Sequence, residues 1–372
     1  MKIVYFFTFD YTLKTWLESG SLDRELEYFD YLNKKYGLSF TLVTYGDKSD
    51  NQIINNMNFI EVIPIYEYTK RSNSKILRYI NSFKIPFILK NKIRNFDVIK
   101  QNQLLGSWVA ILFKFISKKP LITRTGYDMY SFSIYEKKNL FIRILYFLLT
   151  QISLTLSNIY SVTSIVDKIF LEKRFLVKNN KINLIPNWIN NNIFNDFNKR
   201  HENKILGIGR FENQKNFTHL IKSFKNSNVE IDLYGEGSLK SELKKLAEEN
   251  NVKVNFLGVL PYSELQEVYS KYKIFVSTSF FEGNPKTILE AMSFGCVVVA
   301  SNIKNNNELI KNNVSGVIFD FEDNLKEVVE GLFQNRDGAT SLGLNSQKTV
   351  INNNSIDKIA ELDVRDYKKL AR

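Results

Sequence analysis

Short apolar runs rich in β-branched residues alternate along the chain with longer segments of helical spacing. In the first half the apolar runs are KIVYFFTF (2–9), FTLVTYG (40–46), FIEVIPI (59–65), DVIKQN (97–102) and PLITRT (120–125). Helix-length segments separate several of them, and one, SLDRELEYFDYLNKKYG, ends in a glycine suited to stopping a helix. Strands spaced by helices favour a parallel sheet with crossover helices.

The same alternation begins again after INLIPNWIN (182–190), with KILGIGR, EIDLYGEG, VNFLGVL, IFVSTSF, CVVVAS and SGVIFD. Two successive sets predict an α/β protein with two Rossmann-like domains facing a cleft. We expect domains at residues 1–186 and 187–352, and a C-terminal helix at 353–372 that packs back on the first domain. Ligands of open parallel sheets bind beyond the carboxyl ends of the strands, so residues just after each strand are site candidates.

Composition narrows the class of protein. The single cysteine, Cys296, excludes an intrachain disulfide framework and cysteine-cluster metal sites, and its apolar surroundings indicate a buried core residue. The opening MKIVYFF is followed at once by polar residues and predicts a first strand rather than a signal sequence. Residues 140–156 are apolar but contain Arg143 and Gln151, so we expect a buried helix rather than a membrane span. A cytoplasmic protein is the simplest expectation.

The net charge of +12 is concentrated in one segment. Residues 70–100 contain nine Lys or Arg and one acid, Asp97, interleaved with Ile, Leu, Phe and Tyr. Two interpretations stay open: a solvated helical face, or a surface that docks on anionic lipid at the inner face of the membrane. Pro86 excludes one straight helix through the segment. The sequence shows no nucleic-acid-binding module, so we expect no nucleic-acid partner.

Glycines and cations follow two of the predicted strands in the second half. After KILGIG, Gly209 allows a ligand close to the backbone, and Arg210 and Lys215 could hold a diphosphate from two sides. After EIDLY, Gly235 and Gly237 remove side chains at a strand end. A tight turn without a ligand, or ordinary surface cations, would explain these residues as well.

The stretch SFFEGNPKTILEAMSFG (279–295) predicts a helix with an anion site at its start. Asn284 is a suitable N-cap and Pro285 a suitable first helical residue. The amides of Lys286 and Thr287, together with the helix dipole, would favour a phosphate.

Two carboxylates flank this helix start. Glu282 precedes the cap, on the loop that we expect to face the cleft, and the glycine Gly283 follows it. Glu290 sits inside the helix, but helical side chains lean toward the N-terminus, so it could reach a ligand there. If the Glu290 carboxylate is buried among the apolar residues of TILEAM, it needs hydroxyl partners. The alternative is that Glu290 lies on a solvated face of the helix.

At this point the sequence resembles a known family. GRFENQKN, GEG, FLG, EGNPKTILEAMSFGCVVVAS and NNNELI…NNVSGVIFD, in this order and spacing, resemble the donor domain of retaining glycosyltransferases of the GT-B fold, family 4. The likeness is specific from about residue 183 to 320 and looser upstream. It implies that Arg210 and Lys215 bind the donor diphosphate, that Glu282 faces the transferred sugar and that Glu290 binds the ribose. Glu308, in NNNELI, falls where the family often has a Gly-rich turn followed by Glu.

The chain departs from this family pattern in two places. Gly283-Asn284-Pro285 stands where the family often has Gly-Phe-Gly, so the sugar hydroxyls would meet a stiffer turn. The histidine that many members carry near residue 124 is replaced within TRTGYD. The only histidines, His201 and His219, are expected to be surface or packing residues.

The resemblance implies sugar transfer from a nucleoside-diphosphate sugar to a saccharide acceptor in cell-surface polysaccharide or glycolipid synthesis, and we expect this acceptor to be lipid-linked. Asp128 is a candidate catalytic helper, and Gly20, Arg24, Arg124 and Tyr127 are candidate acceptor contacts. No Asp-x-Asp motif stands at a strand end, so we expect no metal requirement and no cofactor. Two alternatives remain, a nucleotide-sugar epimerase and a non-catalytic nucleotide-sugar-binding protein.

Overall fold

The computed structural model describes residues 1–54, 57–177, 180–190 and 197–371. It divides into two compact units, each described by itself. Unit 1 comprises Met1–Ile185 and Ala360–Arg372, and unit 2 comprises Pro186–Ile359. The C-terminal helix therefore ends in unit 1, although the chain reaches it from unit 2.

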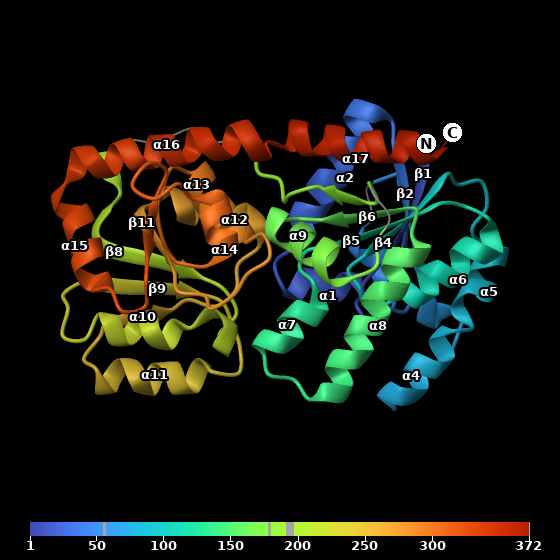
Figure 1. Cartoon of the computed structure of the whole chain (residues 1–372), viewed down its shortest axis with the longest axis horizontal. Helices are drawn as coiled ribbons and strands as arrows, with labels where there is room; N and C mark the ends of the chain where they lie inside the picture. Colours follow the sequence, from blue (N-terminus) through green and yellow to red (C-terminus); the bar gives the residue numbers. More distant parts are fainter. Residues whose placement is uncertain (55–56, 178–179, 191–196, 372) are drawn as a thin grey trace. The chain divides into compact units, whose positions relative to one another are not determined.

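Unit 1 contains a seven-stranded parallel sheet in the order β3-β2-β1-β4-β5-β6-β7 (Figure 1). Its strands are β1 (Lys2–Phe6), β2 (Ser39–Thr44), β3 (Ile60–Pro64), β4 (Val98–Asn102), β5 (Leu121–Thr125), β6 (Ile159–Val162) and β7 (Ile182–Leu184). The strand order reverses between β1 and β4, which is the Rossmann-like arrangement that the alternating sequence pattern predicts.

The helices of unit 1 cover this sheet and extend beyond it. They are α1 (Leu13–Glu18), α2 (Leu22–Tyr36), α3 (Asp50–Ile53), α4 (Lys75–Ser82), α5 (Ile85–Lys92), α6 (Ser107–Ser117), α7 (Met129–Tyr135), α8 (Leu140–Leu156), α9 (Ile165–Arg174) and the greater part of α17 (Ile356–Ala371). Gly37 ends α2 in the left-handed conformation at φ 65°, as its sequence position predicts.

A buried polar cluster fastens α17 to the sheet of unit 1. The Lys100 ammonium, on β4, lies 2.9 Å from the Asp363 carboxylate and donates to the Tyr367 hydroxyl at 2.7 Å. Tyr28 on α2 donates to the other Asp363 oxygen at 2.7 Å. Asn183 donates to Asp366 at 2.8 Å. The expected return of the C-terminal helix to the first domain is thus confirmed, with an ion pair at its centre.

Unit 2 contains a six-stranded parallel sheet in the order β10-β9-β8-β11-β12-β13, again with one reversal. Its strands are β8 (His201–Ile208), β9 (Glu230–Tyr234), β10 (Val254–Phe256), β11 (Tyr272–Ser277), β12 (Val297–Ser301) and β13 (Val317–Phe319). Its helices are α10 (Phe217–Ser223), α11 (Lys240–Glu249), α12 (Tyr262–Ser270), α13 (Lys286–Ser293), α14 (Lys304–Leu309), α15 (Leu325–Gln334) and α16 (Arg336–Asn354).

The expectation of a buried helix at residues 140–156 is wrong. Only Thr150, Ser153 and Leu154 of α8 are buried, while much of its apolar side is exposed. Apolar composition predicts burial only where a neighbouring element is available to cover the helix, and α8 is covered on one side alone. Within the part of the chain that the structure describes, no helix has the length and apolar character needed to span a membrane.

Candidate functional site

The candidate site lies in unit 2, where the strand order reverses. β8 and β11 are neighbours in the sheet although two strands separate them in sequence. The loop after β8 and the loop after β11 therefore start side by side at the carboxyl ends of adjacent strands. In open parallel sheets such a switch point is where ligands bind.

Lys215 and Glu282 meet at this switch point. The Lys215 ammonium lies 2.5 Å from Oε1 of Glu282, and the same oxygen accepts a hydrogen bond from the Ser279 hydroxyl at 2.7 Å. Both side chains of the pair are largely shielded, at 16% and 8% exposure. The contact orients one carboxylate oxygen of Glu282 and places a cation at the start of the loop that leads to α13.

Hydrogen bonds from Gln214 join the two loops. Gln214 accepts from the Phe280 amide at 2.9 Å and donates through its side chain to the Phe281 carbonyl at 2.9 Å. Arg210 is exposed and donates to the Gln214 side chain at 3.3 Å. The predicted diphosphate-binding cations therefore belong to one connected structure, with Arg210 on its exposed side.

The glycines at these strand ends serve close packing of the backbone. A Cβ at Gly235, where φ is 147°, would lie 1.9 Å from the Gly209 carbonyl oxygen. A Cβ at Gly237 would lie 2.5 Å from the Phe211 carbonyl oxygen. One at Gly209 would touch the Lys215 side chain at 3.1 Å. The tight-turn explanation accounts for Gly235 and Gly237, and their contact with a ligand stays a prediction.

The turn before α13 differs from the prediction. Pro285, not Asn284, occupies the N-cap of α13, so the capping role expected for Asn284 is wrong. The buried Asn284 side chain instead accepts from the Asn187 amide at 2.9 Å, and the Asn187 side chain donates to the Asn284 carbonyl at 2.7 Å. Asn354 in turn donates to the Asn187 carbonyl at 2.9 Å. Asparagines far apart in sequence thus hold this turn.

Gly283 and the start of α13 complete the turn. Gly283 is buried, and its carbonyl accepts from the Asn305 side chain at 2.6 Å. Pro285 occupies the N-cap position, but it has no polar side chain and so makes no capping hydrogen bond. Lys286 and Thr287, half-buried, form the first turn of α13, where the helix dipole favours an anion.

Glu290 is buried inside α13, so the alternative of a solvated helical face is wrong. Its Oε2 accepts a hydrogen bond from the Tyr269 hydroxyl of α12 at 3.0 Å. Burial, followed by the nearby Glu290 charge, raises the pKa of Tyr269 well above its usual value, so the hydroxyl stays a donor. The expected hydroxyl partner exists, and it belongs to the protein.

The remaining candidates of unit 2 lie around this core. Glu308 is half-buried on α14. His219 stacks on Phe319 with ring centroids 6.0 Å apart, and His201 packs against Tyr272 at 4.8 Å. Burial lowers the pKa of both histidines, which favours the neutral ring. Both therefore act as packing residues.

Asp128 of unit 1 is a buried helix cap. Its Oδ1 accepts from the Ser131 amide at 2.6 Å at the start of α7, and its Oδ2 accepts from the Thr150 hydroxyl at 3.5 Å. Burial raises the pKa of this carboxyl to about 6. The observed contacts are structural, and a catalytic role for Asp128 stays a prediction.

The four candidate acceptor residues occupy different settings within unit 1. Arg124 lies on β5, one residue before the strand ends. Burial and the nearby Asp363 charge raise the pKa of Tyr28 well above its usual value, and the Arg124 charge opposes this rise, so Arg124 acts on the cluster that holds α17. Tyr127 stacks on Phe132 with ring centroids 4.2 Å apart. Gly20, at φ 70°, turns the chain between α1 and α2, and Arg24 is buried on α2.

Several residues of the site were missed by the sequence reasoning. Gln214 stands between the two cations and Ser279 three residues before Glu282, so their spacing could have indicated a shared loop structure. Asn187, Asn354 and Tyr269 come from distant segments and carry no local signal. Among the described residues, no group of three His, Cys, Asp or Glu is placed to hold a metal ion.

Comparison with known proteins identifies this region. Residues 189–349 match the family model of the glycosyl transferases group 1. Over 185 residues the chain is 29% identical to a GalNAc-alpha-(1->4)-GalNAc-alpha-(1->3)-diNAcBac-PP-undecaprenol alpha-1,4-N-acetyl-D-galactosaminyltransferase of Campylobacter jejuni, covering 48% of this chain and 50% of that protein. It is 31% identical over 177 residues to a UDP-Gal:alpha-D-GlcNAc-diphosphoundecaprenol alpha-1,3-galactosyltransferase of Escherichia coli, covering 42% and 46%. The chain spans about half the length of these relatives.

Solved structures extend the likeness to the fold of the whole chain. HepE of Anabaena, solved in complex with UDP, superposes with a TM-score of 0.76 at 14% identity, covering 100% of both chains. A sucrose-phosphate synthase of Thermosynechococcus elongatus also gives a TM-score of 0.76, at 16% identity and with 100% of this chain covered. The fold is that of the GT-B glycosyltransferases, and within it residues 189–349 match the family model of the glycosyl transferases group 1.

Proposed function

We propose that the chain is a retaining glycosyltransferase that moves a sugar from a nucleoside-diphosphate sugar to a saccharide acceptor carried on a lipid. One observation carries the proposal: a shielded Lys215–Glu282 pair, with Arg210 beside it, at the switch point of a group 1 domain. The relatives named above act, by their names, on undecaprenol-linked saccharides, which supports the acceptor class.

The donor diphosphate is the group that the cations of the site would hold. Its leaving oxygen gains negative charge as the sugar departs, and Arg210, Lys215 and the start of α13 offer positive charge and backbone donors. Groups fixed in place before the reaction stabilise such charge without further rearrangement. Because this charge comes from side chains and a helix end, the proposal requires no metal ion.

Glu282 is the group that would hold the hydroxyls of the transferred sugar. In the structure one of its oxygens is fixed by Lys215 and Ser279. A bound diphosphate would draw Lys215 toward itself, because a ligand carrying more than one negative charge competes with a single carboxylate. Donor binding would then release Glu282 to receive a sugar hydroxyl.

Retention would follow from attack on the face that the leaving group departs from. The bond between the anomeric carbon and the phosphate oxygen breaks, the bond to the acceptor oxygen forms, and the acceptor proton passes to the departing phosphate. Atoms and charge balance without a covalent intermediate. Glu290, held by Tyr269, would contact the ribose of the donor.

Acceptor-dependent release of nucleoside diphosphate tests this function. The purified chain is incubated with UDP-, GDP- or ADP-sugars, with and without undecaprenyl diphosphate-linked saccharides, and the products are separated. One donor should give transfer only when an acceptor is present, with the anomeric configuration kept. Conversion of the donor sugar without an acceptor would instead show an epimerase, and tight donor binding without turnover would show a binding protein.

A further inference from the structure

The helix α8 presents a continuous apolar stripe to solvent. Its exposed apolar residues share one face, and their side chains are 47–76% exposed: Leu140, Phe141, Ile144, Leu145, Leu148 and Ile152. Residues with this spacing lie along one side of an α-helix, here about 25 Å long at 1.5 Å per residue. Monomeric soluble proteins rarely expose large contiguous apolar patches, so this stripe indicates a binding surface.

The helix α4 adds a second exposed apolar face. Ile76, Leu77, Ile80 and Phe83, in and after α4, are 50–71% exposed, and Phe87 on α5 is 61% exposed. The opposite side of α4 is anchored in unit 1. Tyr79 stacks on Phe9 with ring centroids 4.4 Å apart, and Trp108 donates to the Ser82 hydroxyl at 2.8 Å. The exposed apolar face of α4 therefore takes no part in the contacts that hold this helix in unit 1.

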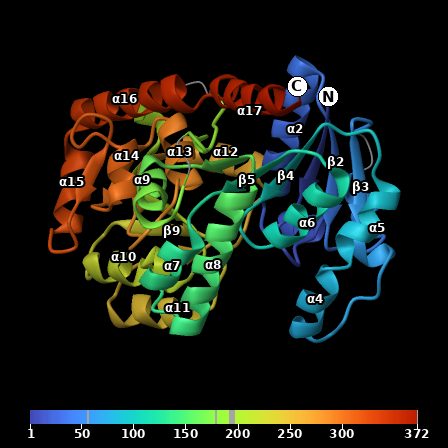
Figure 2. The same cartoon turned by 45° about the vertical axis from the view of Figure 1, so that its right-hand side comes forward.

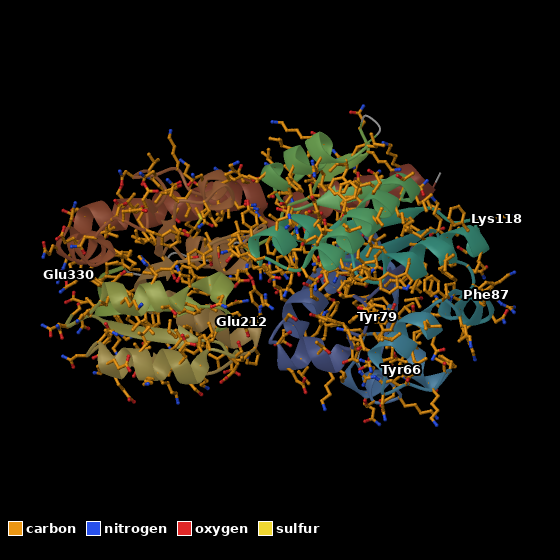
Figure 3. The ribbon with its side chains drawn as sticks, turned by 60° about the horizontal axis from the view of Figure 1, so that its bottom comes forward. Tyr66, Tyr79, Phe87, Lys118, Glu212 and Glu330 are labelled. Carbon is orange, nitrogen blue, oxygen red and sulfur yellow. The ribbon has the colours of Figure 1, made fainter. Side chains whose placement is uncertain are left out.

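The two helices extend from the same side of unit 1. In Figures 1 and 2, which differ by a turn about the vertical axis, α4 and the first turns of α8 both reach below the sheet of unit 1. In Figure 3 this side comes forward, with Phe87 near its outer edge and Tyr79 further in. The two helices therefore lie on one side of the unit, and we name their exposed residues the α4–α8 surface (residues 75–87 and 137–152).

Lysines accompany the apolar residues of this surface. Lys137 and Lys138 precede α8, residues 137–156 contain no acid, and Lys75 and Lys84 flank the apolar face of α4. All four are exposed, although Lys138 also lies 3.4 Å from Glu136.

Three of the nine cations in residues 70–100 already pair with acids of unit 1. Arg71 and Arg78 pair with Asp10 at 3.3 and 3.0 Å, and Lys100 is buried against Asp363. These three are engaged within unit 1. The other six cations of the segment are exposed: Lys70, Lys75, Lys84, Lys90, Lys92 and Arg94.

We propose that the α4–α8 surface lies in the interface of an anionic lipid bilayer. The apolar stripes would enter the boundary between headgroups and acyl chains, and the lysines would meet anionic headgroups. This is how amphipathic helices with basic edges bind membranes without crossing them. A second copy of the chain is a poorer occupant, because a symmetric contact would bring the lysines of both copies together.

The proposal is independent of glycosyl transfer, since it concerns the surface of unit 1 alone. The proposed surface extends beyond the basic segment of residues 70–100, because α8 lies outside that segment and contributes the larger apolar stripe. If the acceptor is lipid-linked, enzyme and acceptor would share the same bilayer surface, but neither conclusion depends on the other.

Flotation with lipid vesicles tests the proposal on the whole chain. We expect binding to vesicles of phosphatidylcholine with 30% phosphatidylglycerol, with weak binding to phosphatidylcholine alone. The triple variant Phe141→Gln, Leu145→Gln, Leu148→Gln should lower the partition coefficient at least about tenfold. The triple variant Lys75→Gln, Lys84→Gln, Lys137→Gln should lower it by roughly 100-fold at low salt.

Matched variants of unit 2 control for the loss of apolar area or charge. Leu257→Gln, Val259→Gln, Leu344→Gln removes exposed apolar residues, and Lys222→Gln, Lys225→Gln, Lys244→Gln removes exposed lysines. Both should bind vesicles like the wild type. Circular dichroism and thermal unfolding would show that every variant is folded, which is expected because all the altered residues are exposed.

An environment-sensitive dye distinguishes insertion from electrostatic adhesion. Cys296 is buried, and burial raises the pKa of its thiol to about 11, so a dye placed through Ile144→Cys would label one site. Its emission should shift to the blue on anionic vesicles, and that of a dye at Leu344→Cys should not. Absence of binding to anionic vesicles, or equal binding by the α8 variant, would overturn the proposal. So would a dimer in solution that the α8 variant abolishes.

Discussion

The two units share one sheet topology and use it differently. Each sheet reverses its strand order once, between β1 and β4 in unit 1 and between β8 and β11 in unit 2. At the reversal of unit 2, the following loops bring together Arg210, Lys215 and Glu282. In unit 1 the Lys100–Asp363 ion pair is buried and holds α17. The shared topology places charged residues near a strand reversal in both units. Whether those charges stabilise the fold or can contact a ligand depends on the residues around them.

The two units also differ in how their exposed apolar residues are arranged. Unit 1 exposes apolar stripes on α4 and α8, whereas the exposed large apolar residues of unit 2 are scattered over several loops and one helix. Unit 2 therefore carries the features of a polar small-molecule site, and unit 1 those of a docking surface. The following predictions test this division.

Breaking the buried pair of unit 1 should have the largest effect. Lys100→Met leaves the Asp363 carboxylate buried with the Tyr28 hydroxyl but without its cation. The loss of one partner of a buried pair costs about 3–5 kcal/mol of unfolding free energy. Lys2→Met, which removes the exposed pair with Glu61, is the control and should cost about 1 kcal/mol or less. Chemical denaturation followed by fluorescence measures both, and equal losses would contradict the assignment.

The pair of unit 2 should matter for turnover more than for folding. Glu282→Gln keeps the shape of the side chain but removes the charge that faces Lys215. We expect the turnover rate to fall by about 10²–10³, the range found when a fixed polar group of an active site is removed. Glu322→Gln, elsewhere in unit 2, is the matched control. A Glu282 variant with wild-type turnover would exclude this carboxylate from the reaction.

Asp128 should make the stability of unit 1 depend on pH. Its pKa is raised to about 6 from the model-peptide value of 3.8, so folding favours the protonated form. Its contribution to stability is present below pH 3.8 and is lost as the pH rises through 6. Relative to Asp128→Asn, which keeps the cap without the charge, the wild type should lose about 2 kcal/mol between pH 4.5 and 7.5. A constant difference between the two proteins across this range would contradict the burial of the charge.

The asparagine cluster at the turn before α13 should give the smallest change. Asn284→Ala removes the acceptor of the Asn187 amide in a buried setting, which costs about 1–3 kcal/mol when the remaining group is left unpaired. Because the turn follows Glu282 directly, turnover should fall as well. Asn307→Ala, at an exposed position, is the control, and thermal unfolding of both variants provides the comparison.

Local patterns predicted the architecture and where in the fold the candidate site residues lie. Alternating apolar runs gave both parallel sheets, and the spacing of Arg210, Lys215, Glu282 and Glu290 placed them at strand ends and on one helix. Contacts between distant segments could not be predicted. Asn187 and Tyr269 hold Asn284 and Glu290 only because the folded chain brings them together, so the capping role given to Asn284 was wrong. The exposure of α8 was missed for a related reason, since composition does not say which neighbours are present.

Nucleotide binding at the switch point of unit 2 is the decisive test of the donor site. Thermal unfolding would be followed with UDP, GDP and ADP, on the wild type, on Arg210→Ala with Lys215→Ala, and on Lys222→Ala with Lys225→Ala as a charge-matched control. A ligand at 100 times its dissociation constant stabilises the folded state by about 2.7 kcal/mol. We predict stabilisation by one nucleotide in the wild type and the control, and its loss in the Arg210 and Lys215 variant. Equal stabilisation of all three proteins, or of none, would contradict a donor site built from these residues.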